Sequence, residues 1–145
     1  MDIPKLFLIP LIAGIFAQFC KLVIQTLKGN PNWRVLINYG GMPSSHSATV
    51  ASLTTVIAIY EGIHSSIFAI CLIFSLIILI DAVGYRRVLG KHSEVLNHMI
   101  AHLPQKEEKR YPRHLREHLG HTPWQVLIGI LIGIMITFFL YLIIP

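Results

Sequence analysis

Two histidines in this chain lie next to hydroxyl side chains at the expected starts of helices, an arrangement that suits chemistry on an oxyanion. His46 lies in GGMPSSHSA, residues 40–48, directly before an apolar segment. His121 lies in GHTPWQVLIGILIG, residues 120–133, before Pro123 and another apolar segment. The first turn of a helix offers free backbone N–H groups and the positive end of the helix dipole, which both attract anions. The pattern therefore predicts two imidazoles at anion-binding helix starts.

Several charged side chains lie at the ends of the neighbouring apolar segments. Lys21 lies near the end of the first segment, and Asp81, Arg86 and Arg87 follow the third. Phosphoryl transfer needs a nucleophile, a proton donor and cations that hold the charged oxygens. If these segment ends meet on one side of a membrane, they supply that set.

The composition is typical of an integral membrane protein. Of 145 residues, 54% are hydrophobic and only 13% are charged, which a soluble domain of this length rarely shows. We predict one all-α domain over residues 1–145, an integral membrane helical bundle with about four transmembrane helices. The predicted spans are about 4–27, 46–62, 64–81 and 124–144.

The second span is rich in small residues, which let helix backbones approach closely in lipid, so we expect it at the centre of the bundle. A re-entrant pair formed by the second and third spans is the alternative. The segment of about 85–119 has apolar residues at helical spacing and predicts an amphipathic interfacial helix. Within it, RHLREHL, residues 113–119, is expected to add a turn or two of helix before Gly120.

The positive charges predict the orientation. With four crossings, the loop 28–45 and the segment 82–123 lie on one side, and they carry ten of the twelve Lys and Arg residues. The positive-inside rule makes this side cytoplasmic, in a protein of the cell membrane. Cys20 and Cys71 lie in apolar stretches and are expected to be buried thiols.

Each chemical interpretation has a structural alternative. Ser44 and the two histidines could simply cap helices at the membrane boundary. Lys21 could extend its ammonium to the interface, and Asp81 could pair with Arg86 or Arg87. Three histidines, His114, His118 and His121, have spacing that suits one helix face, but neither Cys nor paired acids accompany them, so we predict no metal.

Three motifs carry a family resemblance. MPSSHSA, residues 42–48, resembles the Pro-Ser-Gly-His motif of the type 2 phosphatidic acid phosphatases, the superfamily that includes the vanadium haloperoxidases. GHTPWQVLIGILIG is similar to the third motif of that superfamily. DAVGYRRVLGKHSEVLN, residues 81–97, resembles the signature of a small divergent branch described as acid phosphatase/vanadium-dependent haloperoxidase-related. The motifs occur in the family's order, which makes the set more specific than any one of them.

The resemblance implies a role for each matching residue. His121 falls where the family's nucleophilic His becomes a phosphohistidine, and His46 matches the His that protonates the leaving group. Ser44 and the backbone N–H of Ser45 match phosphate-binding positions.

The cations match the family less closely. Lys21 is the candidate for the Lys of the first motif, and Lys28 with Arg34 is the alternative. The candidates for the Arg of the third motif are Arg86, Arg87 and Arg116.

One position departs from the family's pattern. The acid that orients the nucleophilic His falls at Gln125, whose amide accepts a hydrogen bond from imidazole but cannot stabilise its positive charge. Asp81 and Glu94 are the carboxylates that this chain offers in its place.

The resemblance implies a membrane phosphatase-like protein that hydrolyses a lipid or isoprenoid phosphate through a phosphohistidine, without a cofactor. The alternative is a non-catalytic membrane protein that binds a phospholipid or prenyl-phosphate head group. In both cases the expected partners are membrane lipids and a lipid phosphate, with no nucleic acid. Because four helices are few for enclosing a site, we also expect a homodimer.

Overall fold

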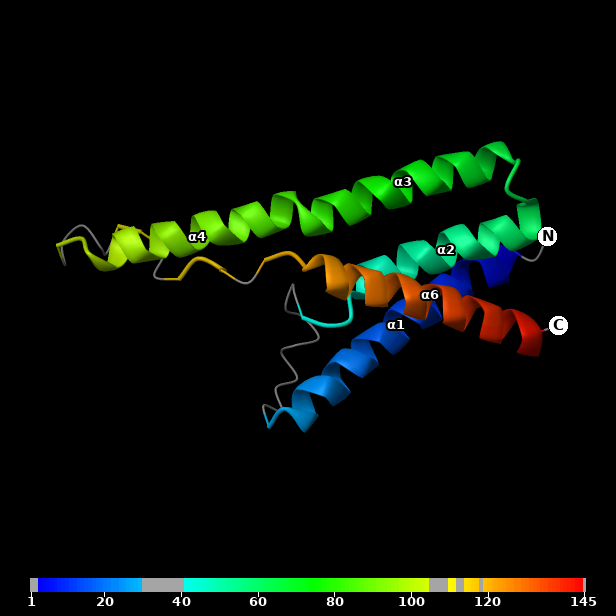
Figure 1. Cartoon of the computed structure of the whole chain (residues 1–145), viewed down its shortest axis with the longest axis horizontal. Coiled ribbons are helices and arrows are strands. Elements are labelled where there is room, and N and C mark those ends of the chain that lie inside the picture. The colour runs from blue at the N-terminus through cyan, green and yellow to red at the C-terminus, as the bar shows by residue number, and fades with distance from the viewer. Residues whose placement is uncertain (1–2, 30–40, 105–109, 112–113, 118, 145) are drawn as a thin grey trace.

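The computed structural model describes residues 3–29, 41–104, 110–111, 114–117 and 119–144, and the described residues form helices and no strands. The helices are α1 (Ile3–Leu27), α2 (Ser45–Glu61), α3 (Ser66–Val83), α4 (Tyr85–Ala101) and α6 (Pro123–Ile143) (Figure 1). The all-α prediction is confirmed.

Side-chain caps set where three of these helices begin. The Ser44 hydroxyl accepts a hydrogen bond from the backbone N–H of Ser47 at the start of α2, and the Ser65 hydroxyl caps α3 in the same way. Thr122 and Gln125 form a reciprocal capping box at the start of α6. Each cap satisfies backbone donors that a helix start leaves unpaired. These caps explain why the helices begin one or two residues away from the predicted positions.

Helix α2 lies at the centre of the bundle, as its small residues predicted, and contacts α1, α3 and α6. Both chain termini and the α2–α3 turn lie at one end of the bundle (Figure 1). The last turns of α1 and α3 and the first turns of α2 and α6 therefore lie towards the opposite end, which we call the polar end. Both α2 and α3 are unbroken helices joined by a short turn, and the choice between two membrane spans and a re-entrant pair stays a prediction.

The interior is built from small and hydroxyl residues. A Cβ atom added at Gly129 would lie 2.5 Å from the Ser44 carbonyl oxygen, and one at Gly133 would overlap the carbonyl of Ala48. The buried hydroxyls of Ser52 and Thr137 are 2.6 Å apart and bond α2 to α6. Close backbone approach and interhelical hydrogen bonds are what hold helices together in lipid.

The large apolar side chains point outwards instead. Phe7 and Ile15 of α1, Ile70 and Phe74 of α3, and Phe138 of α6 are all exposed. An apolar exterior around a small-residue interior suits a lipid environment rather than water.

Among the described residues, three helical stretches are long and apolar enough to cross a membrane: Pro4–Leu27, Ser66–Ala101 and Pro123–Ile143. The prediction of an integral membrane protein is thereby supported. Helix α2 has 17 residues, which at 1.5 Å per residue is about 26 Å, slightly less than the roughly 30 Å hydrocarbon core. The count of four spans stays a prediction.

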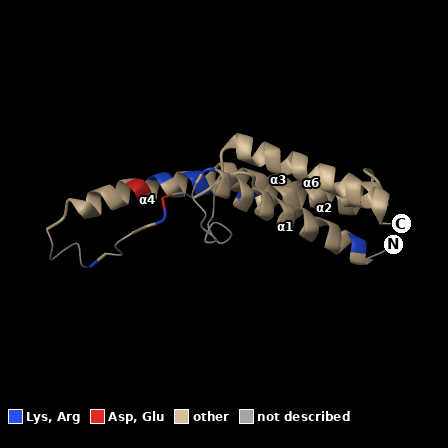
Figure 2. Cartoon of the chain, turned by 90° about the horizontal axis from the view of Figure 1, so that it is seen from below, with Lys and Arg blue, Asp and Glu red and all other residues tan. Residues whose placement is uncertain are grey.

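Helix α4 continues α3 in nearly the same direction and projects beyond the rest of the bundle (Figure 1). Most of the Lys, Arg, Asp and Glu residues visible in Figure 2 lie along α4 and where it meets the bundle, and one blue residue lies on α1 near the N-terminus. Its apolar residues, including Val88, Leu96 and Met99, are exposed. The amphipathic helix is therefore present, and its location at the membrane interface stays a prediction.

The helical turns expected in residues 113–119 are wrong for the described part of that segment, since residues 114–117 and 119 are not helical. The reason is a set of tertiary contacts. The Asn97 side-chain amide donates to the carbonyl of Leu115 and accepts from its N–H, at 2.8 and 2.9 Å. We call the described residues 114–117 and 119–121 the return segment, because they lead from a contact with Asn97 of α4 back to Ala82 in the bundle.

Candidate phosphate site

His121 is held at the junction of three helices. Its backbone N–H donates to the carbonyl of Ala82 near the end of α3, at 2.9 Å. Four residues later, the Gln125 carbonyl accepts from the N–H of Ser44 at the start of α2, at 3.2 Å. These two bonds place the start of α6 between the ends of α2 and α3.

Two glycines let the return segment lie directly against α4. Gly120 has φ +82°, and a Cβ atom there would lie 2.6 Å from the backbone nitrogen of Arg87. A Cβ at Gly90 would overlap the carbonyl of Glu117. Positive φ and close backbone approach both favour glycine. The backbone before His121 is therefore fixed by contact with α4.

The imidazole of His121 is buried and has no hydrogen-bond partner in the described part of the chain. Its side chain is only 7% exposed, and neither Nδ1 nor Nε2 is paired. Burial lowers the pKa of His121 to about 4, and the charges of Lys21, His46 and Arg86 contribute to this shift. At neutral pH the ring is therefore uncharged and carries a nitrogen lone pair. A buried polar group without a partner is expensive, and this often marks a place for a ligand.

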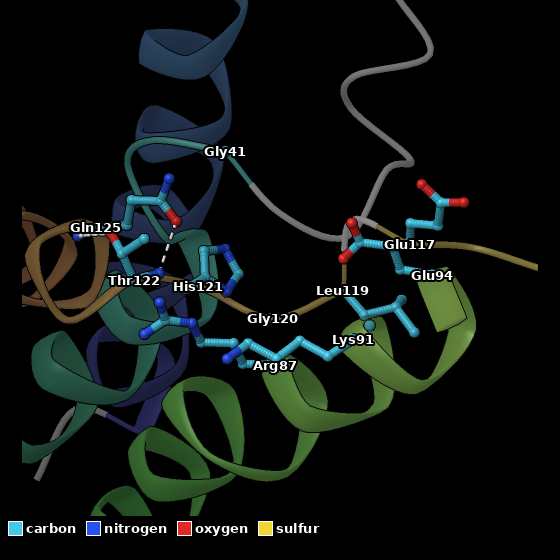
Figure 3. Close-up of a pocket in the computed structure, with 11 residues that line it drawn as sticks. Gly41, Arg87, Lys91, Glu94, Glu117, Leu119, Gly120, His121, Thr122 and Gln125 are labelled. Carbon is cyan, nitrogen blue, oxygen red and sulfur yellow. Dashed lines mark hydrogen bonds between the residues drawn. The ribbon is translucent and has the colours of Figure 1, made fainter. Parts of the chain in front are cut away.

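A pocket of about 310 Å³ opens in front of His121 (Figure 3). It lies between the start of α6, the return segment and one face of α4. Arg87 and Lys91 of α4 line it with His121, as do Glu94 and Glu117. The pocket thus joins an imidazole to side chains of both charges.

The structure brings Lys21, Arg86 and Asp81 close to this pocket without making them part of its lining. Lys21 is 2% exposed, and its charge and that of Arg86 act on His121. The Arg86 Nε atom donates to a carboxylate oxygen of Asp81 at 2.6 Å. Asp81 therefore pairs with Arg86, as the structural alternative predicted. Arg116 is exposed on the return segment and does not line the pocket.

His46 does not line the pocket in front of His121 but faces a separate groove. It is exposed in the first turn of α2 and lines a groove of about 230 Å³ between α1 and α2, with Leu11 and Ile15. Its charge still influences His121. Ser44 is fully buried as the cap of α2, and Ser45, in the first turn, lines the same groove as His46.

Gln125 uses its side chain to cap α6. Its Oε1 atom accepts from the N–H of Thr122 at 2.9 Å, and its own N–H donates to the Thr122 hydroxyl at 3.3 Å. In this arrangement its amide does not bond to His121. An orienting role for Gln125 stays a prediction. Glu94, the other carboxylate considered, does line the pocket.

Comparison with known proteins agrees with this architecture. Residues 4–136 match the Divergent PAP2 family. The chain belongs to this family. It is 39% identical to the uncharacterized membrane protein YuiD of Bacillus subtilis (strain 168) over 138 residues, covering 88% of this chain and 87% of that protein. No solved structure matches. The predicted relationship to a divergent branch of the type 2 phosphatidic acid phosphatases is confirmed.

Two charged residues of the pocket in this Divergent PAP2 protein were not predicted from the sequence as site residues, Lys91 and Glu117. The sequence spacing could have predicted Lys91, because it lies four residues after Arg87 and three before Glu94, which places all three on one helix face. No sequence pattern predicts Glu117, since it reaches the pocket only through the return segment.

Some sequence-based candidates lie outside the described residues, namely Arg34, Lys106, Lys109, Arg113 and His118. Within the part of the chain that the structure describes, no group of three or more His, Cys, Asp or Glu is placed to hold a metal ion.

Proposed function

We propose that this member of the Divergent PAP2 family is a membrane phosphatase that hydrolyses a lipid or isoprenoid phosphate. The observation that carries the proposal is the buried, uncharged and unpaired imidazole of His121 in the lining of a pocket that also holds Arg87 and Lys91. An uncharged imidazole is a competent nucleophile, and nearby cations stabilise the oxygens of a phosphoryl group.

In the proposed reaction, a ring nitrogen of His121 attacks phosphorus while the bond from phosphorus to the lipid oxygen breaks. His46 in its protonated form gives its proton to that oxygen and releases a lipid alcohol. Water then attacks the phosphohistidine, His46 takes up the proton from the water, and inorganic phosphate leaves. Arg87, with Lys21, Arg86 and the N–H groups at the start of α2, holds the remaining phosphate oxygens.

The position of His46 favours a substrate with an apolar tail. His46 lines the groove between α1 and α2, where Leu11 and Ile15 are its apolar neighbours. A leaving alcohol that extends into this groove would have its oxygen beside His46 and its chain against apolar residues. We propose that the pocket faces the cytoplasm, since the cations gather at the polar end. A homodimer is a further part of this proposal.

The capping role of Gln125 favours a second candidate function. With its amide bound to Thr122 and no carboxylate bonded to the ring of His121 in the described residues, a developing imidazolium has little support. In enzymes with a catalytic triad, loss of the orienting acid costs about four orders of magnitude in rate. The alternative is therefore a membrane protein that binds a phospholipid or prenyl-phosphate head group without turnover.

Phosphate release separates these functions. Purified protein in detergent would be given phosphatidic acid, phosphatidylglycerophosphate and prenyl pyrophosphates, with and without vanadate. We expect vanadate-sensitive release that falls at least about a thousand-fold in His121→Ala. His92→Ala is the matched control, because His92 is an exposed histidine of α4 that does not line the pocket. Saturable binding of a lipid phosphate without release would favour the second function, and equal release by wild type and His121→Ala would reject the phosphohistidine.

A further inference from the structure

The pocket in front of His121 has its opposite charges at opposite ends. In Figure 3 the side chains of Arg87 and Lys91 run from α4 back towards His121 and Thr122, while Glu94 and Glu117 lie together at the other end. The end next to His121 is therefore cationic and the outer end is acidic.

The geometry of α4 produces this separation. Arg87, Lys91 and Glu94 share one helix face, and Glu94 lies seven positions after Arg87, which is roughly 10 Å along the helix at 1.5 Å per residue. Helical side chains lean towards the N-terminus of their helix, which here is the end nearest the bundle. The two long cations consequently reach towards His121.

These charges do not neutralise one another. In the described ranges, neither Arg87 nor Lys91 forms an ion pair with Glu94 or Glu117. The carboxylate of Glu117 is instead held by Asn97, whose side-chain N–H donates to it at 2.8 Å. The same Asn97 amide also donates to the Leu115 carbonyl and accepts from the Leu115 N–H. The acidic end is therefore a built feature, with its carboxylate positioned by a second side chain.

The unpaired imidazole of His121 marks one end of the pocket as a place for a polar ligand. It is buried, lines the pocket, and has both ring nitrogens without a partner in the described residues. An anion at this end would still leave two carboxylates facing the rest of the ligand. Charge complementarity then requires a cation on that part of the ligand.

We propose that this pocket binds a phosphate ester whose alcohol carries an ammonium group, as in a phosphoethanolamine head group. The phosphate lies at His121, Arg87 and Lys91, and the ammonium lies between Glu94 and Glu117. The inference rests on the proposed function only for the position of the phosphate, which the enzymatic and the binding alternatives share.

The comparison ligand is a phosphate ester whose alcohol part is an uncharged polyol. Glycerol phosphate is close in size to phosphoethanolamine and would fit the volume of about 310 Å³ equally well. It would leave Glu94 and Glu117 near its phosphate without a counter-charge, so the carboxylates would repel it. The pocket should therefore discriminate by charge rather than by size.

The test measures binding of soluble ligands to the full chain in phosphatidylglycerol nanodiscs. We expect O-phosphoethanolamine to bind about ten-fold more tightly than glycerol 3-phosphate, and inorganic phosphate to resemble the latter. The double variant Glu94→Gln/Glu117→Gln should remove this preference, because it weakens the binding of phosphoethanolamine and relieves the repulsion of glycerol phosphate. The Glu117→Gln change retains a side-chain oxygen that can accept from Asn97, so the return segment should stay in place. Glu61→Gln, at the other end of α2, is the charge-matched control.

The same assay identifies the source of the ligand. Nanodiscs that contain phosphatidylethanolamine should weaken the apparent affinity for soluble phosphoethanolamine if the lipid head group enters the pocket. Unchanged affinity would assign the pocket to a soluble phosphate ester with the same chemistry.

Three outcomes would overturn the inference: equal affinity for the two esters, a preference that survives in the double variant, or tight binding of glycerol phosphate that requires Mg²⁺. Its failure is distinguishable from failure of the proposed function. An ammonium preference without phosphate release would reject the phosphatase and leave this inference standing. Phosphate release without that preference would reject this inference alone.

Discussion

Burial of an uncharged His121 predicts a specific loss of stability in acid. The pKa of His121 is lowered to about 4, from 6.5 in an unfolded chain, and burial is the main cause. Each pKa unit of difference corresponds to about 1.4 kcal/mol, so the full effect is about 3 kcal/mol.

The direction of the effect follows from proton binding. Above pH 6.5 the ring is uncharged in both states, and its contribution to stability is fully present. Between pH 6.5 and 4 the His121 ring binds a proton in the unfolded chain but not in the folded protein, so the free energy of unfolding falls. Below pH 4 both states are protonated, and this residue causes no further change.

The assay is unfolding by sodium dodecyl sulfate in mixed micelles at about pH 7.5, 5.5 and 4, for wild type and His121→Gln. Since the other seven histidines are the same in both proteins, the difference between the two free energies isolates His121. We expect the difference to shift by about 3 kcal/mol against the wild type from the highest to the lowest pH. The control variant His92→Gln should follow the wild-type curve. A difference between wild type and His121→Gln that stays constant across this pH range would refute the buried, uncharged imidazole.

Three further predictions concern the contacts that position the site. Gly133→Leu should destabilise the bundle by about 1–3 kcal/mol, because its side chain would meet the α2 backbone; unchanged unfolding would contradict this packing. Thr137→Val should cost about 1 kcal/mol by removing the buried hydrogen bond to Ser52, and Ser52→Ala/Thr137→Val should cost no more than the single change if the two hydroxyls act as a pair. Asn97→Leu should release the return segment, and we expect faster hydrogen exchange of the Leu115 amide. Exchange at the wild-type rate would show that Asn97 does not hold this segment.

Local sequence patterns determined the helices and their starts. The apolar stretches are long enough to cross a membrane, and a Ser or Thr that can cap a helix stands at the beginning of α2, α3 and α6. Capping residues and apolar periodicity are local features, so they can be recognised in a single sequence. The small residues of α2 likewise predicted its central position, because close approach in lipid depends on side-chain size.

The sequence also named several residues that line the candidate site. His121, Arg87 and Glu94 were named from residue type and motif, and the structure places all three around one pocket. The sequence could not predict what each polar group bonds to. Gln125 lies at the position where the family has an acid, yet its side-chain oxygen accepts from the backbone N–H of Thr122, which is the nearer donor at the start of α6.

Only the tertiary structure decided how the site is assembled. The N–H of His121 meets the carbonyl of Ala82 across 39 positions, and Glu117 reaches the pocket because Asn97 binds the return segment. Residues 114–117 have a helical sequence pattern, but the backbone N–H and carbonyl of Leu115 bond to Asn97 of α4 instead of within a helix. Contacts between distant residues depend on how whole helices pack, and single-sequence patterns record only the faces that pack. The sequence therefore specified the groups, and the packing of α4 against the bundle specified their arrangement.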